Sequence, residues 1–169
     1  MALPPVALGV MMLIFFARNP LGSFINNNIM PVIFNTPGIV IAQFAVVSAL
    51  AVRLLKETFD GVPPRYEKIA RTLGYTELEA FLHVTFPMAI KGFLATCLFV
   101  FARAMGEFGA TLMLAGATRL KTETLPIAIY LSLAKGDLEG VAALSYVLLL
   151  ISIITQIIIR KLLFKGAST

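Results

Sequence analysis

Long apolar stretches dominate the pattern of hydrophobic and polar residues along the chain. Four of them stand out, at 1–17, 31–52, 88–102 and 141–159. The third carries a charge near its start, Lys91, where a lysine side chain can reach the membrane interface. A bilayer core about 30 Å thick is crossed by roughly 20 helical residues. The pattern therefore predicts an all-α integral membrane protein with about four spanning helices, the first of them cut short.

The composition supports this class. Of the 169 residues, 59% are hydrophobic and 14% are charged, whereas soluble domains have about 45–50% apolar and about 25% charged residues. The net charge of +5 could suggest nucleic acid as a partner. The basic residues flank the apolar stretches instead of gathering on one polar face, which excludes that interpretation. The single cysteine, Cys97, allows no intrachain disulfide.

A secretory signal peptide is the alternative interpretation of residues 1–17. Such a peptide begins with a positively charged segment and ends at a small-residue cleavage site. No lysine or arginine precedes Arg18, and Pro4-Pro5 fits poorly in a signal core. A membrane helix is the favoured interpretation of this segment.

The distribution of basic residues predicts the topology, because cytoplasmic loops are enriched in lysine and arginine. One side of the membrane receives Arg53, Lys56, Arg65, Lys68, Arg71, Lys91, Arg160, Lys161 and Lys165. The other side receives fewer, namely Arg18, Arg103, Arg119, Lys121 and Lys135. We therefore expect the loop at about 55–86 and the C-terminus to be cytoplasmic. The 18–30 loop, with its three consecutive asparagines, and the 107–139 segment are expected outside or at the outer mouth of a pore.

The loop at 59–87 has the local signals of a helical hairpin. Pro63-Pro64 can open a helix, and Gly74 suits the left-handed residue that ends one. Thr76 and Glu79 have the spacing of a capping box, which starts a second helix. Helical spacing places four apolar residues of the first helix on one stripe: Tyr66, Ile69, Ala70 and Leu73. By physics alone, an ordinary amphipathic hairpin resting on the bilayer explains the loop equally well.

The same loop resembles the cytoplasmic signature of ABC importer permeases, which reads Glu-Ala-Ala, three residues, Gly, nine residues, Ile-x-Leu-Pro. The frame runs from Lys68 to Pro87, with Ala70 at the second alanine and Gly74 at the glycine. Lys68 and the residue after it depart from the pattern, although Glu67 stands one position earlier. The departures put in doubt a specific role for a carboxylate at position 68.

The resemblance implies that residues 59–87 are the coupling hairpin, which docks on a separate ATPase subunit. The residues carried over to this role are Glu67, Lys68, Ala70, Arg71, Gly74 and Pro87. Glu67 and Arg71 are expected on the polar face of the hairpin, and Ala70 and Gly74 where the chains approach closely. The sequence contains no Gly-x-x-x-x-Gly-Lys-Ser/Thr phosphate loop. ATP is therefore expected on the partner, with no cofactor in this chain and no enzyme activity by itself.

Residues 106–145, which include GEFG and TETLPIAIY, are similar to molybdate and tungstate permeases, as are Leu-Pro-Pro at 3–5 and the segment at 42–50. Sulfate permeases share GEFG. Full-length members have about six spanning helices, so the resemblance implies that residues 1–169 are a single permease domain that lacks the first two. The subfamily implies an extracytoplasmic oxyanion-binding protein, a second permease copy and membrane lipid as partners, in the plasma membrane.

A candidate gate follows the third apolar stretch. Arg103 and Glu107 lie four residues apart, so they can pair across one helical turn. Charges within a spanning helix usually face a bundle interior or water. One interpretation is a structural pair; another lets the pair line a gate, with Gly106 and Gly109 permitting close helix approach. A gate or re-entrant segment at 107–130 and a loose external loop remain alternatives.

Other function classes are less compatible with the sequence. An intramembrane enzyme would need a His-Glu-x-x-His motif or paired aspartates at membrane depth, and neither occurs. The lone histidine, His83, has no second ligand at metal-binding spacing. The remaining alternatives are a sulfate or thiosulfate permease and a truncated subunit that binds the ATPase without transporting.

Overall fold

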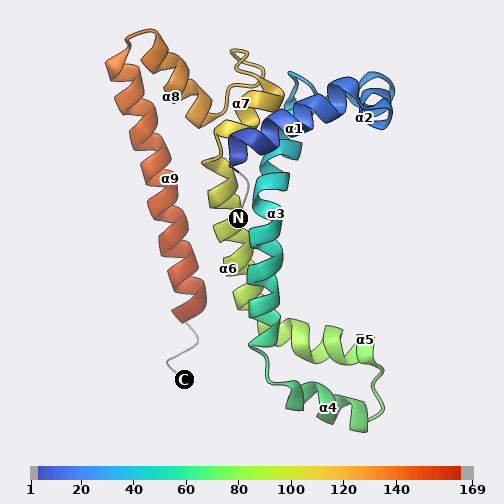
Figure 1. Cartoon of the computed structure of the whole chain (residues 1–169). Coiled ribbons are helices and arrows are strands. Elements are labelled where there is room, and N and C mark those ends of the chain that lie inside the picture. Colours follow the sequence, from blue (N-terminus) through green and yellow to red (C-terminus); the bar gives the residue numbers. More distant parts are fainter. Residues whose placement is uncertain (1–3, 165–169) are drawn as a thin grey trace. The chain divides into compact units, whose positions relative to one another are not determined.

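The structure is a computed structural model that describes residues 4–164. Every regular element in this part of the chain is helical (Figure 1). The elements in order are α1 (Pro5–Arg18), α2 (Pro20–Phe24), the π-helical turn η1 (Ile25–Ile29), α3 (Thr36–Asp60), α4 (Pro64–Thr72), α5 (Glu77–Ala80), the π-helical turn η2 (Phe81–Thr85), α6 (Phe86–Met105), α7 (Gly109–Ala115), α8 (Leu125–Ala134) and α9 (Leu138–Phe164).

Three helical runs among the described residues are long and apolar enough to cross a membrane. They are 36–60, 77–105 and 138–163. The first predicted span corresponds to 5–18 followed by 20–29, and these two pieces are bent by 75°. If the bent pair is one span, the count becomes four. The all-helical membrane fold predicted from hydropathy is confirmed.

The segment before α3 differs from the expected loop. Asn19 accepts a hydrogen bond from the backbone N–H of Leu21 at 3.0 Å and so caps α2. The three asparagines then lie in η1 rather than in irregular chain. The side chain of Asn26 accepts from the backbone N–H groups of Val32 and Ile33 at 2.9 and 3.0 Å. These bonds satisfy backbone donors that have no helical partner, which explains why an asparagine-rich stretch is ordered here.

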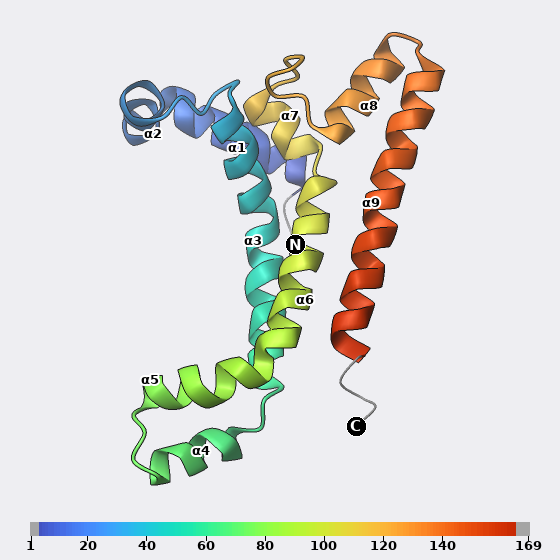
Figure 2. The same ribbon diagram turned by 180° about the vertical axis from the view of Figure 1, so that it is seen from behind.

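The chain divides into two compact units, each described by itself. The first contains residues up to 48 together with 102–152. Within it α1 packs along α7 (Figures 1 and 2). The buried core of this unit is formed by Phe16, Val32, Ala42, Val46, Ala110 and Leu114.

The second unit contains residues 49–101 and the chain from 153 onward. It includes the later part of α3, the first part of α6, the C-terminal part of α9 and the hairpin made by α4 and α5. The hairpin follows the end of α3, as Figure 2 shows, and its second helix leads into α6 through the residues of η2. Residues 1–3, where the first apolar stretch begins, and residues 165–169, which include Lys165 and the C-terminus, lie outside the described residues.

Candidate functional site

The first helix of the hairpin begins and ends where the sequence predicts. Pro63 is extended and Pro64 is the first helical residue of α4. At the other end Gly74 has φ +98°, the left-handed conformation expected of it. The N–H of Gly74 donates to the carbonyl of Arg71 at 3.1 Å, and that of Tyr75 donates to the carbonyl of Ala70 at 3.2 Å. These two bonds form a Schellman motif and fix the direction in which the chain leaves α4.

The second helix is fixed by the predicted capping box. The N–H of Thr76 donates to Oε2 of Glu79 at 2.8 Å, and the N–H of Glu79 donates to Oγ1 of Thr76 at 3.3 Å. Across the turn, Arg71 and Glu77 form an ion pair at 3.0 Å. Residues 4–164 contain no group of three or more possible metal ligands, and Nδ1 of His83 lies 2.9 Å from the carbonyl oxygen of Glu79. The turn between the two helices is thus defined by contacts that are local in sequence.

A π-helical turn joins the hairpin to the spanning helix α6. A π turn holds one extra residue, which shifts the faces of the helix before and after it. Here η2 turns Thr85 toward α4, where its side chain is buried and its hydroxyl donates to Oε2 of Glu67 at 3.4 Å. Pro87 is the second residue of α6 and directly follows the π turn; because proline has no N–H, it donates no backbone hydrogen bond to that turn.

Four phenylalanine rings pack where α3, η2 and α6 meet, and we call them the phenylalanine joint: Phe59, Phe81, Phe86 and Phe93. The ring centroid of Phe59 lies 5.5 Å from that of Phe81 and 6.4 Å from those of Phe86 and Phe93. Phe86 and Phe93 are 5.6 Å apart. Such distances are typical of favourable aromatic pairs. The joint connects the end of one spanning helix, the hairpin and the start of the next spanning helix.

The outward side of α4 is apolar. The exposed fraction of the side chains on the predicted stripe rises from 36% at Tyr66 to 55% at Ile69 and 75% at Leu73. Only Ala70 of that stripe is buried. Glu67 was expected on the outer polar face with Arg71; the structure instead places it, half-buried, against Thr85. The outer rim of the stripe is basic, with Arg65, Lys68 and Arg71 exposed.

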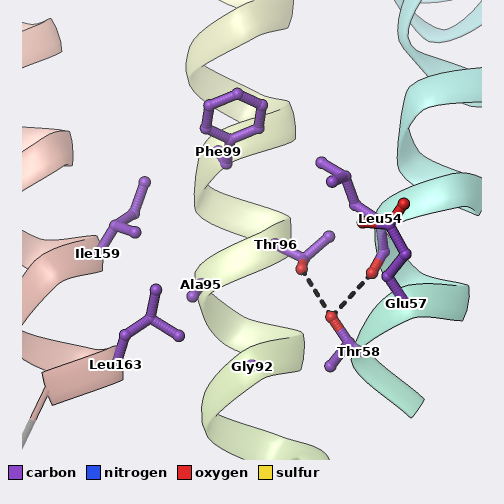
Figure 3. A pocket seen from close by; sticks show the side chains of 9 residues that line it. All are labelled: Leu54, Glu57, Thr58, Gly92, Ala95, Thr96, Phe99, Ile159 and Leu163. Carbon is purple, nitrogen blue, oxygen red and sulfur yellow. Dashed lines mark hydrogen bonds between the residues drawn. The ribbon is translucent and has the colours of Figure 1, made fainter. Parts of the chain in front are cut away.

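Next to the hairpin, the spanning helices of the second unit are joined by two hydroxyl groups (Figure 3). The Thr58 hydroxyl donates its single proton to the carbonyl of Leu54 at 2.8 Å, so Thr96 is the donor in the 3.1 Å bond between the two threonines. An added Cβ at Gly92 would lie 2.8 Å from the Thr58 methyl group, so a glycine permits this approach. The cavity beside them has a volume of about 380 Å³, and its lining includes Phe99.

The predicted ion pair of the candidate gate is present. Nη1 of Arg103 lies 3.1 Å from Oε2 of Glu107, whose side chain is 4% exposed. The other carboxylate oxygen of Glu107 accepts from the N–H of Ala110 at 3.2 Å. Helix α6 ends before this residue, so the carboxylate ties α6 to the start of α7 across the break. An added Cβ at Gly109 would lie 2.6 Å from Cγ2 of Val6, whereas one at Gly106 would meet only a carbonyl oxygen at 3.8 Å.

Comparison with known proteins identifies the family of this chain. Residues 1–165 match the family of binding-protein-dependent transport system inner membrane components. The chain belongs to this family. It is therefore a multi-pass permease component of the inner membrane, and not itself a catalytic subunit.

The curated relatives differ in the substrate their names give. A probable transport system permease protein, NifC, of Clostridium pasteurianum is 33% identical over 94% of this chain and 55% of its own length. A probable molybdenum ABC transporter permease of Haloferax volcanii is 36% identical over 96% and 58%. The sulfate transport system permease protein CysW of Synechocystis is 32% identical over 93% and 57%. The chain thus spans a little more than half the length of these relatives.

Three features of the hairpin were not predicted from the sequence: the π turn, the phenylalanine joint and the inward position of Glu67. One signal was available. Phe86 and Phe93 are seven residues apart, which places them on one face of a helix. The partner ring, Phe59, comes from the other side of the loop, and no local pattern identifies it.

Proposed function

We propose that this chain is the permease subunit of an ATP-driven oxyanion importer and that residues 59–87 dock a separate ATPase on the cytoplasmic side. The observation that carries the proposal is the exposed apolar stripe at Tyr66, Ile69 and Leu73. A contiguous apolar surface with a polar rim is typical of a protein interaction site. The Schellman turn and the capping box hold this surface in one geometry, as a docking element requires.

A hairpin lying on the bilayer would also bury an apolar stripe. The family match supports the ATPase, whereas a basic rim beside an apolar stripe would suit either surface. Arg65, Lys68 and Arg71 are exposed beside the stripe, and Arg71 is already paired with Glu77. Glu67, the one carboxylate in α4, lies inward against Thr85, so the outward face of α4 is basic and apolar. The assembly we propose also contains an extracytoplasmic oxyanion-binding protein and a second permease copy, with this chain's C-terminus in the cytoplasm.

A single substitution tests the docking surface. Leu73→Ser should weaken binding of the ATPase to the permease about tenfold or more, because burying a leucine contributes about 1.5–3 kcal/mol. Thr72→Ser is the matched control, since Thr72 is the adjacent exposed residue and serine can keep its hydroxyl bond to the carbonyl of Ile69. Co-purification of the ATPase from detergent measures both variants. Equal binding by the Leu73 variant and the wild type would contradict the docking assignment.

The substrate we propose is molybdate or tungstate. Support comes from the similarity of residues 106–145 to permeases of that subfamily and from relatives that carry molybdenum in their names. Sulfate is the second candidate, because the sulfate permease CysW matches over a similar range. A subunit that binds the ATPase without transporting is the third.

Uptake separates these candidates. Proteoliposomes that contain the permease, its ATPase and its binding protein are supplied with labelled molybdate, tungstate or sulfate, with and without ATP. ATP-dependent uptake of molybdate or tungstate supports the first candidate, and uptake of sulfate alone supports the second. ATPase binding without any uptake supports the third. Failure of the ATPase to bind at all would refute the proposed function.

A further inference from the structure

The loop between α7 and α8 is held in one conformation by its own hydrogen bonds. The side chain of Thr122 is fully buried, and its hydroxyl donates to the carbonyl of Gly116 at 3.3 Å and accepts from the N–H of Thr118 at 3.0 Å. The N–H groups of Lys121 and Thr122 both donate to the carbonyl of Thr118, at 3.1 and 2.9 Å. Residues 118–122 therefore form a closed turn with a fixed tip.

Leu120 occupies that tip in a conformation that costs free energy. Its φ is +60°, in the left-handed region that residues with a side chain disfavour. Its side chain is 95% exposed, so burial does not compensate the cost. Oε2 of Glu123 accepts from the N–H of Leu120 at 3.1 Å and holds the backbone in place. Backbone strain that is maintained by its surroundings is a reason to look for function.

Two further features surround the exposed leucine. Arg119 and Lys121, on either side of it, are both exposed, so the tip is apolar at its centre and positive at its flanks. Beside the tip lies a hollow of about 490 Å³ whose lining includes Ser132 and Leu144. A folded partner could receive the projecting Leu120 side chain in a pocket of its own and place one of its own side chains in the hollow.

We propose that Arg119, Leu120 and Lys121 are the docking tip for the extracytoplasmic binding protein, with Leu120 entering an apolar pit that has an acidic rim. This inference rests on the proposed function, which places the loop outside the cell. The flanking cations require acidic groups on the partner. A membrane surface would also attract a leucine between two cations. However, lipid contact needs no fixed side-chain direction, whereas this tip is held against its backbone preference.

The test uses the complete complex in proteoliposomes and measures ATP hydrolysis as a function of the concentration of substrate-loaded binding protein. Leu120→Gly removes the side chain and suits the positive φ, so the turn is preserved. The concentration of binding protein that gives half-maximal stimulation should rise about ten- to hundredfold, as expected for the loss of a buried leucine. The basal hydrolysis rate should not change. Leu21→Gly, at another highly exposed leucine, should leave both quantities unchanged.

A charge variant tests the acidic rim. Arg119→Glu should raise the same half-maximal concentration and weaken its dependence on salt, because the introduced carboxylate would cancel the charge of Lys121 and the net attraction is lost. If Leu120→Gly responds like the wild type in a complex that transports, the docking tip is wrong and the proposed function stands. If the effect of Leu120→Gly follows the fraction of anionic lipid rather than the binding protein, the tip is a lipid contact and the inference is overturned. A wild-type complex without any stimulation would instead refute the proposed function.

Discussion

Substitution of Gly74 tests the proposed coupling role of the hairpin most directly. Gly74 has φ +98°, and no atom lies within 4 Å of the position that a Cβ would occupy there. Within this chain, any effect of Gly74→Val must therefore come from the backbone and not from a steric clash. The conformation at this residue directs α4 into the turn before Thr76, so a change in φ alters the angle between the two hairpin helices.

The size of the effect follows from this geometry. A left-handed residue with a side chain costs about 1–2 kcal/mol, and a β-branched residue is the least tolerated. Taking about 2 kcal/mol, the population of the observed turn relative to alternative turns falls roughly thirtyfold. The spanning helices are unaffected, so the protein should still insert in the membrane at a normal level.

The assay measures two quantities in the same proteoliposomes: the amount of ATPase bound and the number of substrate ions imported per ATP hydrolysed. We expect Gly74→Val to lower the number of ions imported per ATP several-fold. Gly74→Asn should have a smaller effect, because asparagine tolerates positive φ better. Gly136→Val is the matched control, since Gly136 also has a positive φ, +75°, and no atom within 4 Å of its Cβ position, but lies between α8 and α9.

The outcomes have distinct meanings. If Gly74→Val imports substrate with the wild-type yield per ATP, the turn does not contribute to coupling and the reasoning is wrong. If Gly136→Val loses the same yield, the effect reports backbone strain in general. A drop at Gly74 alone supports the hairpin as the connection to the ATPase.

Two further predictions concern contacts away from the turn. Phe59→Ala, in the phenylalanine joint, should reduce imported substrate per ATP while the ATPase still binds; Phe101→Ala, at an exposed phenylalanine, is its control. Arg103→Met should destabilise the protein more than Glu107→Gln, by roughly 3 against 1 kcal/mol, because it leaves a buried carboxylate without its cation, whereas Arg103 is 42% exposed and can be hydrated. Thermal unfolding in detergent compares the two, and an equal loss of stability would contradict a buried role for the carboxylate.

The features predicted correctly from the sequence are those whose cause is local. Pro64 restricts φ at one position, Gly74 permits a positive φ at another, and the capping box of Thr76 and Glu79 spans one helical turn. The three long helices follow from hydropathy alone, because lipid requires every backbone group in them to be paired. The ion pair of Arg103 and Glu107 was also predictable, since four-residue spacing brings two side chains together even near a helix end.

The features that were missed depend on contacts between distant residues. Glu67 lies on the inner side of α4 because η2 brings Thr85 to it, and nothing in the α4 sequence indicates that partner. The asparagine-rich segment was expected to be a loop, but Asn26 gains two backbone donors from residues beyond the segment. At Leu120 the local preference points away from the observed conformation, because leucine disfavours positive φ.

The hairpin is held by two kinds of contact, and these should fail in different ways. The turn depends on hydrogen bonds and an ion pair in water, such as that of Arg71 with Glu77, whose side chains are 51% and 75% exposed. Contacts of this kind fix direction but are individually weak. The attachment to α3 and α6 depends instead on packed rings around Phe59, and close packing of this kind resists compression and transmits strain. A perturbed turn should therefore present the ATPase with a misdirected surface, while a perturbed joint should leave docking intact and lose the movement before it reaches the spanning helices. The Gly74 and Phe59 variants should therefore differ in the ratio of bound ATPase to imported substrate. If they gave the same ratio, the turn and the phenylalanine joint would not have separate roles.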